Sequence, residues 1–160
     1  MNAYPKLKAD IAALFNTQYF AVLAIRAGDA VHTSLVAVAA AEDLKTVFLC
    51  TPRVSRKYAY LKQHPMVSLL IHNSTNHPTD TEQAIAVTVA GHAHEVPDTE
   101  RAQAKATYLD RQPHLHAFVE APGTAMIKIT VNRCEVVARF QDVTILDIQN
   151  DRILDTMAPS

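Results

Sequence analysis

Three adjacent residues, Ser55, Arg56 and Lys57, have types and spacing that suit the binding of a phosphate group. Serine is a favoured N-cap, so the sequence predicts a helix over 55–63 with both cations in its first turn. Cations there oppose the helix dipole, which favours anions at that end by about 0.3–1 kcal/mol each. A bound phosphate reverses this cost, because free backbone N–H groups, both cations and the Thr51 hydroxyl could converge on it. A solvated basic first turn is the alternative.

The charges of the chain are segregated around this motif. No Asp or Glu lies between Asp43 and Asp80, although the whole chain of 160 residues has a net charge of −1. The cations of this stretch are Lys45, Arg53, Arg56, Lys57 and Lys62. Positive charge is therefore local, which favours an anion site and argues against a general field for nucleic acid.

The elements that must position these residues are mostly strands. Runs rich in β-formers alternate with turn residues, which predicts six or more strands in hairpin order and a largely antiparallel, closed sheet. The predicted strands cover residues 19–25, 31–41, 45–50, 66–72, 85–96, 126–131 and 135–140, with a further extension over 144–148. The predicted fold class is thus mainly β with peripheral helices.

Helical periodicity and capping residues predict three helices, over residues 5–16, 55–63 and 99–110. We expect residues 1–148 to form a single domain and 149–160 a C-terminal tail, frayed from Arg152 onwards. The N-terminal stretch has no continuous apolar run like that of a signal peptide, and no segment is apolar for long enough to span a membrane. These features predict a cytoplasmic protein.

The central segment resembles the pyridoxamine 5′-phosphate oxidase superfamily. Its Ser-Arg-Lys helix start, Leu61, and the run His64-Pro65-Met66-Val67-Ser68-Leu69-Leu70 are similar to that family's motif. Thr51 matches a threonine that ends the preceding strand in the family, and Gly91 matches a glycine of a later strand. The resemblance covers roughly residues 20–140.

This resemblance implies an FMN-binding split β-barrel that forms homodimers with two flavins at the interface. By match to the family, Arg56 and Lys57 are phosphate ligands, and Cys50 and Thr51 lie along the cofactor. The stretch 32–36 matches the strand whose backbone runs beside the isoalloxazine. The implied cofactor-binding residues are Ser34, Leu35, Val36, Cys50, Thr51, Ser55, Arg56 and Lys57.

Several departures separate this chain from the oxidase proper. It has no Trp, and the family's Tyr with an Arg four residues later appears here as Tyr108 and Gln112, with Arg111 one position early. Ala86 replaces a glutamine that contacts flavin. We therefore expect a short branch distinct from the oxidase, which acts as a flavin-dependent oxidoreductase with NAD(P)H as one possible reductant. A flavin carrier or sensor, a haem-binding protein, and use of the deazaflavin coenzyme F420 are the alternatives.

Other reactive residues have ordinary explanations. Cys50 and Cys134 lie far apart in apolar runs, which indicates buried, reduced thiols, although Cys50 could instead act as a redox thiol beside a flavin. His92 and His94 share one face of a predicted strand, and His114 and His116 repeat the spacing. These pairs could begin a metal or haem site, but a polar strand face explains them equally well, and we expect no metal.

Overall fold

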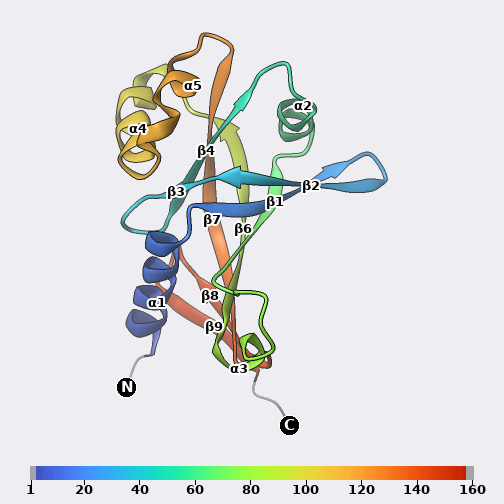
Figure 1. The fold of residues 1–160 in the computed structure, drawn as a ribbon, viewed down its shortest axis with the longest axis vertical. Coiled ribbons are helices and arrows are strands. Elements are labelled where there is room, and N and C mark those ends of the chain that lie inside the picture. Colours follow the sequence, from blue (N-terminus) through green and yellow to red (C-terminus); the bar gives the residue numbers. More distant parts are fainter. Residues whose placement is uncertain (1–2, 158–160) are drawn as a thin grey trace.

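The computed structural model describes residues 3–157, and their main element is one curled, nine-stranded antiparallel sheet (Figure 1). The strands are β1 (Phe20–Ala27), β2 (Ala30–Ala37), β3 (Ala39–Ala40), β4 (Thr46–Pro52), β5 (Met66–His72), β6 (Ile85–Glu95), β7 (Thr124–Ala138), β8 (Asp142–Asp147) and β9 (Arg152–Met157). This confirms the predicted mainly β split barrel.

Within residues 3–157, six helical segments lie around the sheet. They are α1 (Tyr4–Thr17), α2 (Arg56–Gln63), α3 (Asp80–Gln83), α4 (Asp98–Arg111), the 3₁₀ turn η1 (Pro113–Leu115) and α5 (His116–Glu120). The three longest match the predicted helices. In the part of the chain that the structure describes, no helix combines the length and apolarity needed to cross a membrane.

The sheet closes because one strand is bent into two. The strand order is β2-β1-β5-β6-β7-β4-β3, and β2 leads into β3 through the single residue Val38. The two ends of the order are therefore consecutive in the chain. The predicted single strand over 31–41 was wrong in this respect, because the pairing with β1 ends after Ala37 and residues 39–40 pair with β4. Between them, Val38 donates its N–H to the carbonyl of Tyr19 at 3.1 Å.

Helix α4 and Gln112, the residue that follows it, cover this bend from outside. The Gln112 side chain is fully buried, and its amide donates to the carbonyls of Tyr19 at 2.9 Å and Val38 at 3.0 Å. The hydroxyl of Tyr108 donates to the carbonyl of Ala37 at 3.2 Å. The two residues whose spacing departs from the oxidase motif therefore hold the barrel closed in this chain.

Two predictions near the C-terminus were wrong. Residues 126–131 and 135–138 belong to one strand, β7, because Asn132-Arg133 continues the strand through a β-bulge opposite β6 and does not form a turn. Residues 139–140 lie in the turn before β8. The first part of β7 pairs with β4 and the second with β8. Residues expected to fray form β9, which pairs with β8 across a turn held by Asp147, whose carboxylate accepts from Asn150 and Arg152. Residues 158–160 lie outside the described residues.

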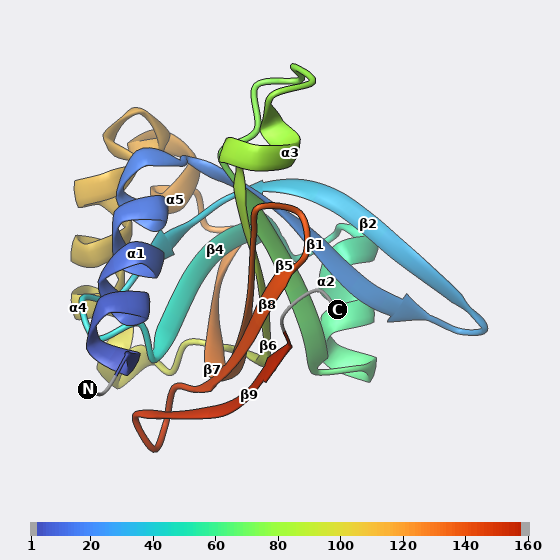
Figure 2. The same cartoon turned by 90° about the horizontal axis from the view of Figure 1, so that it is seen from below.

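The core fills the inside of the curled sheet. Helix α1 places Ile11, Leu14 and Phe15 there, as its periodicity predicted, and a second apolar cluster lies between β4, β7 and α4. Seen from below, α1 and α4 lie on one side, while the β1–β2 hairpin reaches out on the other (Figure 2).

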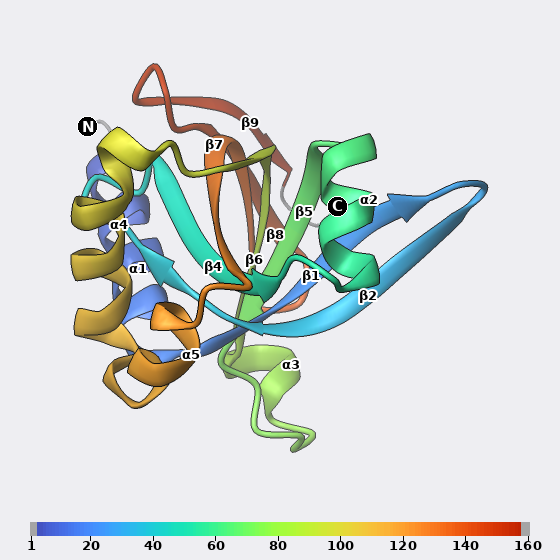
Figure 3. The ribbon, with the colours of Figure 1, turned by 90° about the horizontal axis from the view of Figure 1, so that it is seen from above.

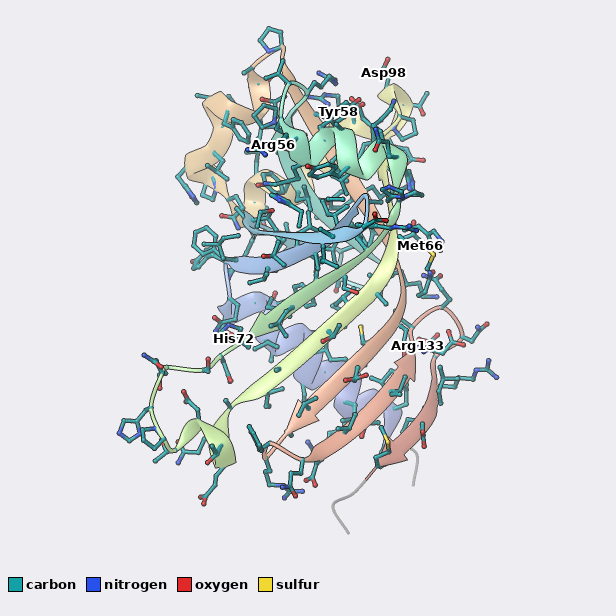
Figure 4. The ribbon with its side chains drawn as sticks, turned by 90° about the vertical axis from the view of Figure 1, so that its right-hand side faces the viewer. Arg56, Tyr58, Met66, His72, Asp98 and Arg133 are labelled. Carbon is teal, nitrogen blue, oxygen red and sulfur yellow. The ribbon has the colours of Figure 1, made fainter. Side chains whose placement is uncertain are left out.

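The outer face of β1, β2, β5 and β6 has no helix over it in the described residues. Figure 4 looks onto this face, with α1 behind the sheet. Cross-strand register brings Val22, Leu35 and Leu70 together there, and the last two are 67% and 39% exposed. Smaller side chains, Ser68 and Ala90, are paired beside them. We refer to this apolar surface as the outer face.

The β-bulge between Ala90 and Gly91 leaves no room for a side chain at position 91. A Cβ on Gly91 would lie 2.3 Å from the carbonyl oxygen of Thr130 and 2.9 Å from Ile129 Cγ2. Because the first atom belongs to the backbone of a central strand, it cannot turn aside. This explains why the position requires glycine.

We therefore expect Gly91→Ala to lower the free energy of unfolding by about 1–3 kcal/mol, the usual cost of overpacking a well-packed interior. Urea unfolding measures the effect. Gly123→Ala is the matched control, because a Cβ there meets nothing within 4 Å. Equal stability of the two variants would contradict the steric argument.

Candidate functional site

The N-terminus of α2 is built as the sequence predicted. Ser55 has extended backbone angles, and its hydroxyl accepts the Tyr58 N–H at 3.1 Å, which is a standard N-cap. The hydroxyl of Thr51, at the end of β4, lies 2.9 Å from that of Ser55. The end of the strand and the start of the helix are thus joined by hydroxyl groups.

Arg56 and Lys57 occupy the first turn, which contains no acidic residue. Arg56 is exposed, and within residues 3–157 neither cation has an ion pair. Lys57 is half-buried, and burial lowers the pKa of its ammonium group. Two cations at the positive end of a helix with no counter-charge favour an anion at this position.

The remaining cations of the basic stretch do not converge on this helix end. Arg53 is paired with Glu95, Lys45 reaches the carbonyl of Gln149 at 3.4 Å, and Lys62 lies over the Tyr58 ring. Only two of the five positive charges are therefore free at the site. Sequence reasoning could count the charges but could not find their partners.

Glu95, at the end of β6, is the residue that the sequence analysis missed. Its carboxylate accepts from the Arg53 guanidinium and from the Tyr58 hydroxyl, the latter at 2.7 Å. These contacts hold the pKa of Glu95 below its usual range against the opposing effect of burial. No spacing signal links residues 42 positions apart in the sequence.

Strand β2 runs beside α2, as the view from above shows (Figure 3). The ring of His32 lies 5.5 Å from that of Tyr60 on α2. Ser34 faces the same side of the strand as His32, and its Oγ is buried without a hydrogen-bond partner among the described residues. Such an orphaned hydroxyl fits a ligand with polar groups.

Of the other two residues matched to the family's cofactor strand, only Val36 shares the face of β2 that carries His32 and Ser34. Val36 is buried in the core, and Leu35 lies on the outer face, away from α2. The structure thus places Thr51, Ser55, Arg56 and Lys57 together at the end of β4 and the start of α2. Ser34 lies on the face of β2 that contacts α2 through His32 and Tyr60. The structure does not bring the side chain of Leu35 to them. A backbone role for Leu35 and Val36 stays a prediction.

Both cysteines are free thiols, as predicted. Burial raises the pKa of the Cys50 thiol to about 12, and burial also raises the pKa of the Cys134 thiol. A thiol with such a pKa stays protonated near neutral pH, and the thiolate is the reactive form. This favours the structural interpretation of Cys50 over a redox role.

The strand histidines have polar neighbours. His92 Nδ1 lies 2.9 Å from Asn132 Nδ2, and the pKa of His94 is lowered by burial and by Lys128. Across residues 3–157, no three His, Cys, Asp or Glu side chains gather closely enough to hold a metal ion.

Comparison with solved structures gives the same architecture at low sequence identity. A heme binding protein from Mycobacterium smegmatis superposes with a TM-score of 0.74 at 18% identity, over 86% of this chain and 58% of its own. A protein from Clostridium acetobutylicum related to general stress protein 26 gives a TM-score of 0.72 at 13% identity, over 91% and 97% of the two chains. A FAD-binding protein from Mesorhizobium loti gives 0.64 at 13% identity, over 80% and 91%.

No curated protein matches the sequence. The family model described as pyridoxamine 5′-phosphate oxidase, by contrast, matches residues 7–138, which include every strand from β1 to β7. The split barrel, the serine-capped helix α2 and this match agree, and the chain belongs to the pyridoxamine 5′-phosphate oxidase family.

Proposed function

We propose that this chain is a flavoprotein that binds FMN and acts as an oxidoreductase distinct from the oxidase proper. The cofactor phosphate would bind at the start of α2 and the flavin ring beside β2. The observation that carries the proposal is that Arg56 and Lys57, at the start of α2, have no ion-pair partner within residues 3–157. The buried hydroxyl of Ser34, without a hydrogen-bond partner in the same residues, lies on the face of β2 that turns toward α2.

The charge argument supports a dianionic ligand. A phosphate monoester carries about −1.5 to −2 charge near pH 7, which two cations and a helix dipole balance. Phosphate oxygens also accept hydrogen bonds from free N–H groups of the first turn and from the hydroxyl of Thr51. Without such a ligand, the half-buried ammonium of Lys57 has no compensation for its lost hydration.

The polar groups available along β2 fit the remainder of FMN. Ser34 can donate to or accept from an edge of the flavin ring, and backbone groups of the strand can supply further hydrogen bonds. When bound, FMN supplies the redox chemistry, and the protein contributes binding, orientation and electrostatics. A nicotinamide is a suitable reductant, and a small oxidised organic molecule a suitable second substrate.

A haem-binding or carrier role is the second candidate. The heme binding protein from Mycobacterium smegmatis and the FAD-binding protein from Mesorhizobium loti indicate that one barrel accommodates different prosthetic groups. His92, exposed at the outer face, offers an imidazole that haem iron could use.

The proposal predicts that purified protein titrated with FMN shows a perturbed flavin spectrum and tight, saturable binding. Riboflavin, which lacks the phosphate, should bind at least tenfold more weakly, and added salt should weaken FMN binding more than riboflavin binding. Parallel titrations with coenzyme F420 and haemin test the alternatives. A Soret shift with haemin and no response to FMN would replace the flavin assignment.

Replacement of Arg56 should separate a ligand site from a merely basic turn. We expect Arg56→Ala to weaken FMN binding roughly tenfold to a hundredfold, the value of one charge-assisted contact of about 1.5–3 kcal/mol. Lys57→Ala should act similarly but more mildly. Thermal melts of the apo-protein should be unchanged or slightly higher, since a cation leaves the positive end of a helix.

Lys62→Ala, at the opposite end of the same helix, is the matched control and should keep wild-type affinity. Wild-type FMN affinity in both Arg56→Ala and Lys57→Ala would remove these residues from the site, whatever the fold.

We further propose that the protein is a homodimer, joined through the outer face. Val31, Leu35 and Met66 are each at least 67% exposed there, and apolar surface of this extent usually marks an interface. Small residues in its centre, such as Ser68 and Ala90, would allow two sheets to approach closely.

A charged side chain in the centre of this face should therefore disrupt the dimer. We expect Leu70→Lys to sediment as a monomer under conditions in which the wild type sediments as a dimer. Phe140→Lys is the control, because Phe140 is 71% exposed but lies in the β7–β8 turn. A monomeric wild type that binds FMN tightly would overturn this assignment.

A further inference from the structure

Arg53 is a third cation beside the proposed phosphate site, and the fold neutralises it. Its guanidinium pairs with the Glu95 carboxylate, with Nε at 3.1 Å from Oε1, and Nη1 donates to the carbonyl of Pro122 at 3.0 Å. Its backbone N–H donates to the carbonyl of Gly123 at 2.9 Å. Arg53 is therefore anchored by three groups only two residues before the N-cap of α2.

The same carboxylate also holds the first turn of α2. Glu95 Oε2 accepts the Tyr58 hydroxyl at 2.7 Å, and Tyr58 donates its N–H to Ser55, so Glu95 reaches the N-cap through one intermediate residue. Arg56 and Tyr58 both lie on the first turn of the helix (Figure 4). Glu95 thus contacts the neutralised cation and the element that carries the two free ones.

We infer that Glu95 is a positioning residue that sets the net charge of the phosphate site by cancelling the charge of Arg53. This inference rests on the proposed FMN site. With Arg53 paired, two free cations, Arg56 and Lys57, face a dianionic phosphate monoester, so the charges match. With Arg53 unpaired, a third positive charge, carried two residues before the N-cap of α2, would act on the same phosphate over a range set by the Debye length of about 8 Å.

Glutamine at position 95 isolates this electrostatic effect. Its amide oxygen can still accept from Arg53 in the place of Oε1, while its amide N–H, in the place of Oε2, can donate to the Tyr58 hydroxyl oxygen. Its size is that of glutamate, so both contacts can persist, the second with its direction reversed, while the negative charge is lost. The exposed setting of the pair means that its removal changes the local potential more than the stability.

Glu95→Gln should bind FMN more tightly than the wild type, on the order of threefold to tenfold at low salt, with a steeper loss of affinity as salt is added. Riboflavin affinity should not change, because riboflavin carries no phosphate. Arg53→Ala alone leaves Glu95 unneutralised and should weaken FMN binding. The double variant Arg53→Ala, Glu95→Gln restores the wild-type charge and should restore the wild-type salt dependence.

The set of four proteins distinguishes the possible failures. If wild-type protein binds FMN and riboflavin equally, the proposed phosphate site is wrong. If the wild type prefers FMN but Glu95→Gln shows the wild-type salt dependence, the role of Glu95 is wrong while the site stands. If the variants move FMN and riboflavin affinities in parallel, Glu95 has a structural role only, and the inference is overturned.

Discussion

The fold depends on how the barrel is closed at Val38. The strands β2 and β3 are the two ends of the strand order, and the chain connects them by bending one strand into two, so that β2 pairs with β1 and β3 with β4. At the bend, the backbone carbonyls of Tyr19 and Val38 need hydrogen-bond donors out of contact with water, and the buried side-chain amide of Gln112 donates to both. A hydrophobic side chain of similar size would leave the Val38 carbonyl without this donor and the Tyr19 carbonyl with only the Val38 N–H, so the bend favours a polar group at this position.

The candidate site is a consequence of that closure. Because β2 continues into β3, and β3 pairs with β4, the side of β2 that carries Ser34 comes near the end of β4. There Thr51 and Ser55 join the strand end to α2, which aligns the free N–H groups of the helix with its two unpaired cations. Residues from positions 34 to 57 thus meet through strand pairing and not through a local motif. The rigid barrel holds these groups in position, which loops alone could not do.

Much of this arrangement could be predicted from local sequence signals. Ser55 followed by helix formers fixes the start of α2, and the alternation of β-formers with turn residues reveals most strands. The wrong predictions concern segments whose local sequence signal is ambiguous. Val38 lies in a run of residues typical of one continuous strand, and Asn132-Arg133 resembles a break between two strands. Residues 152–157 are too polar to predict a strand without β8 beside them. In each case tertiary pairing decided the conformation.

The charge of the site illustrates what a sequence cannot supply. A count over residues 44–79 gives five cations and no acid, yet the acid that neutralises Arg53 comes from the end of β6, outside that stretch. The antiparallel pairing of β6 with β7, and of β7 with β4, carries Glu95 to the loop that precedes α2. Electrostatic potential at a binding site depends on which charges remain unpaired after folding, and the strand order determines that pairing. The two cations that the fold leaves free are the ones that α2 carries on its first turn, where a helix dipole adds to their field.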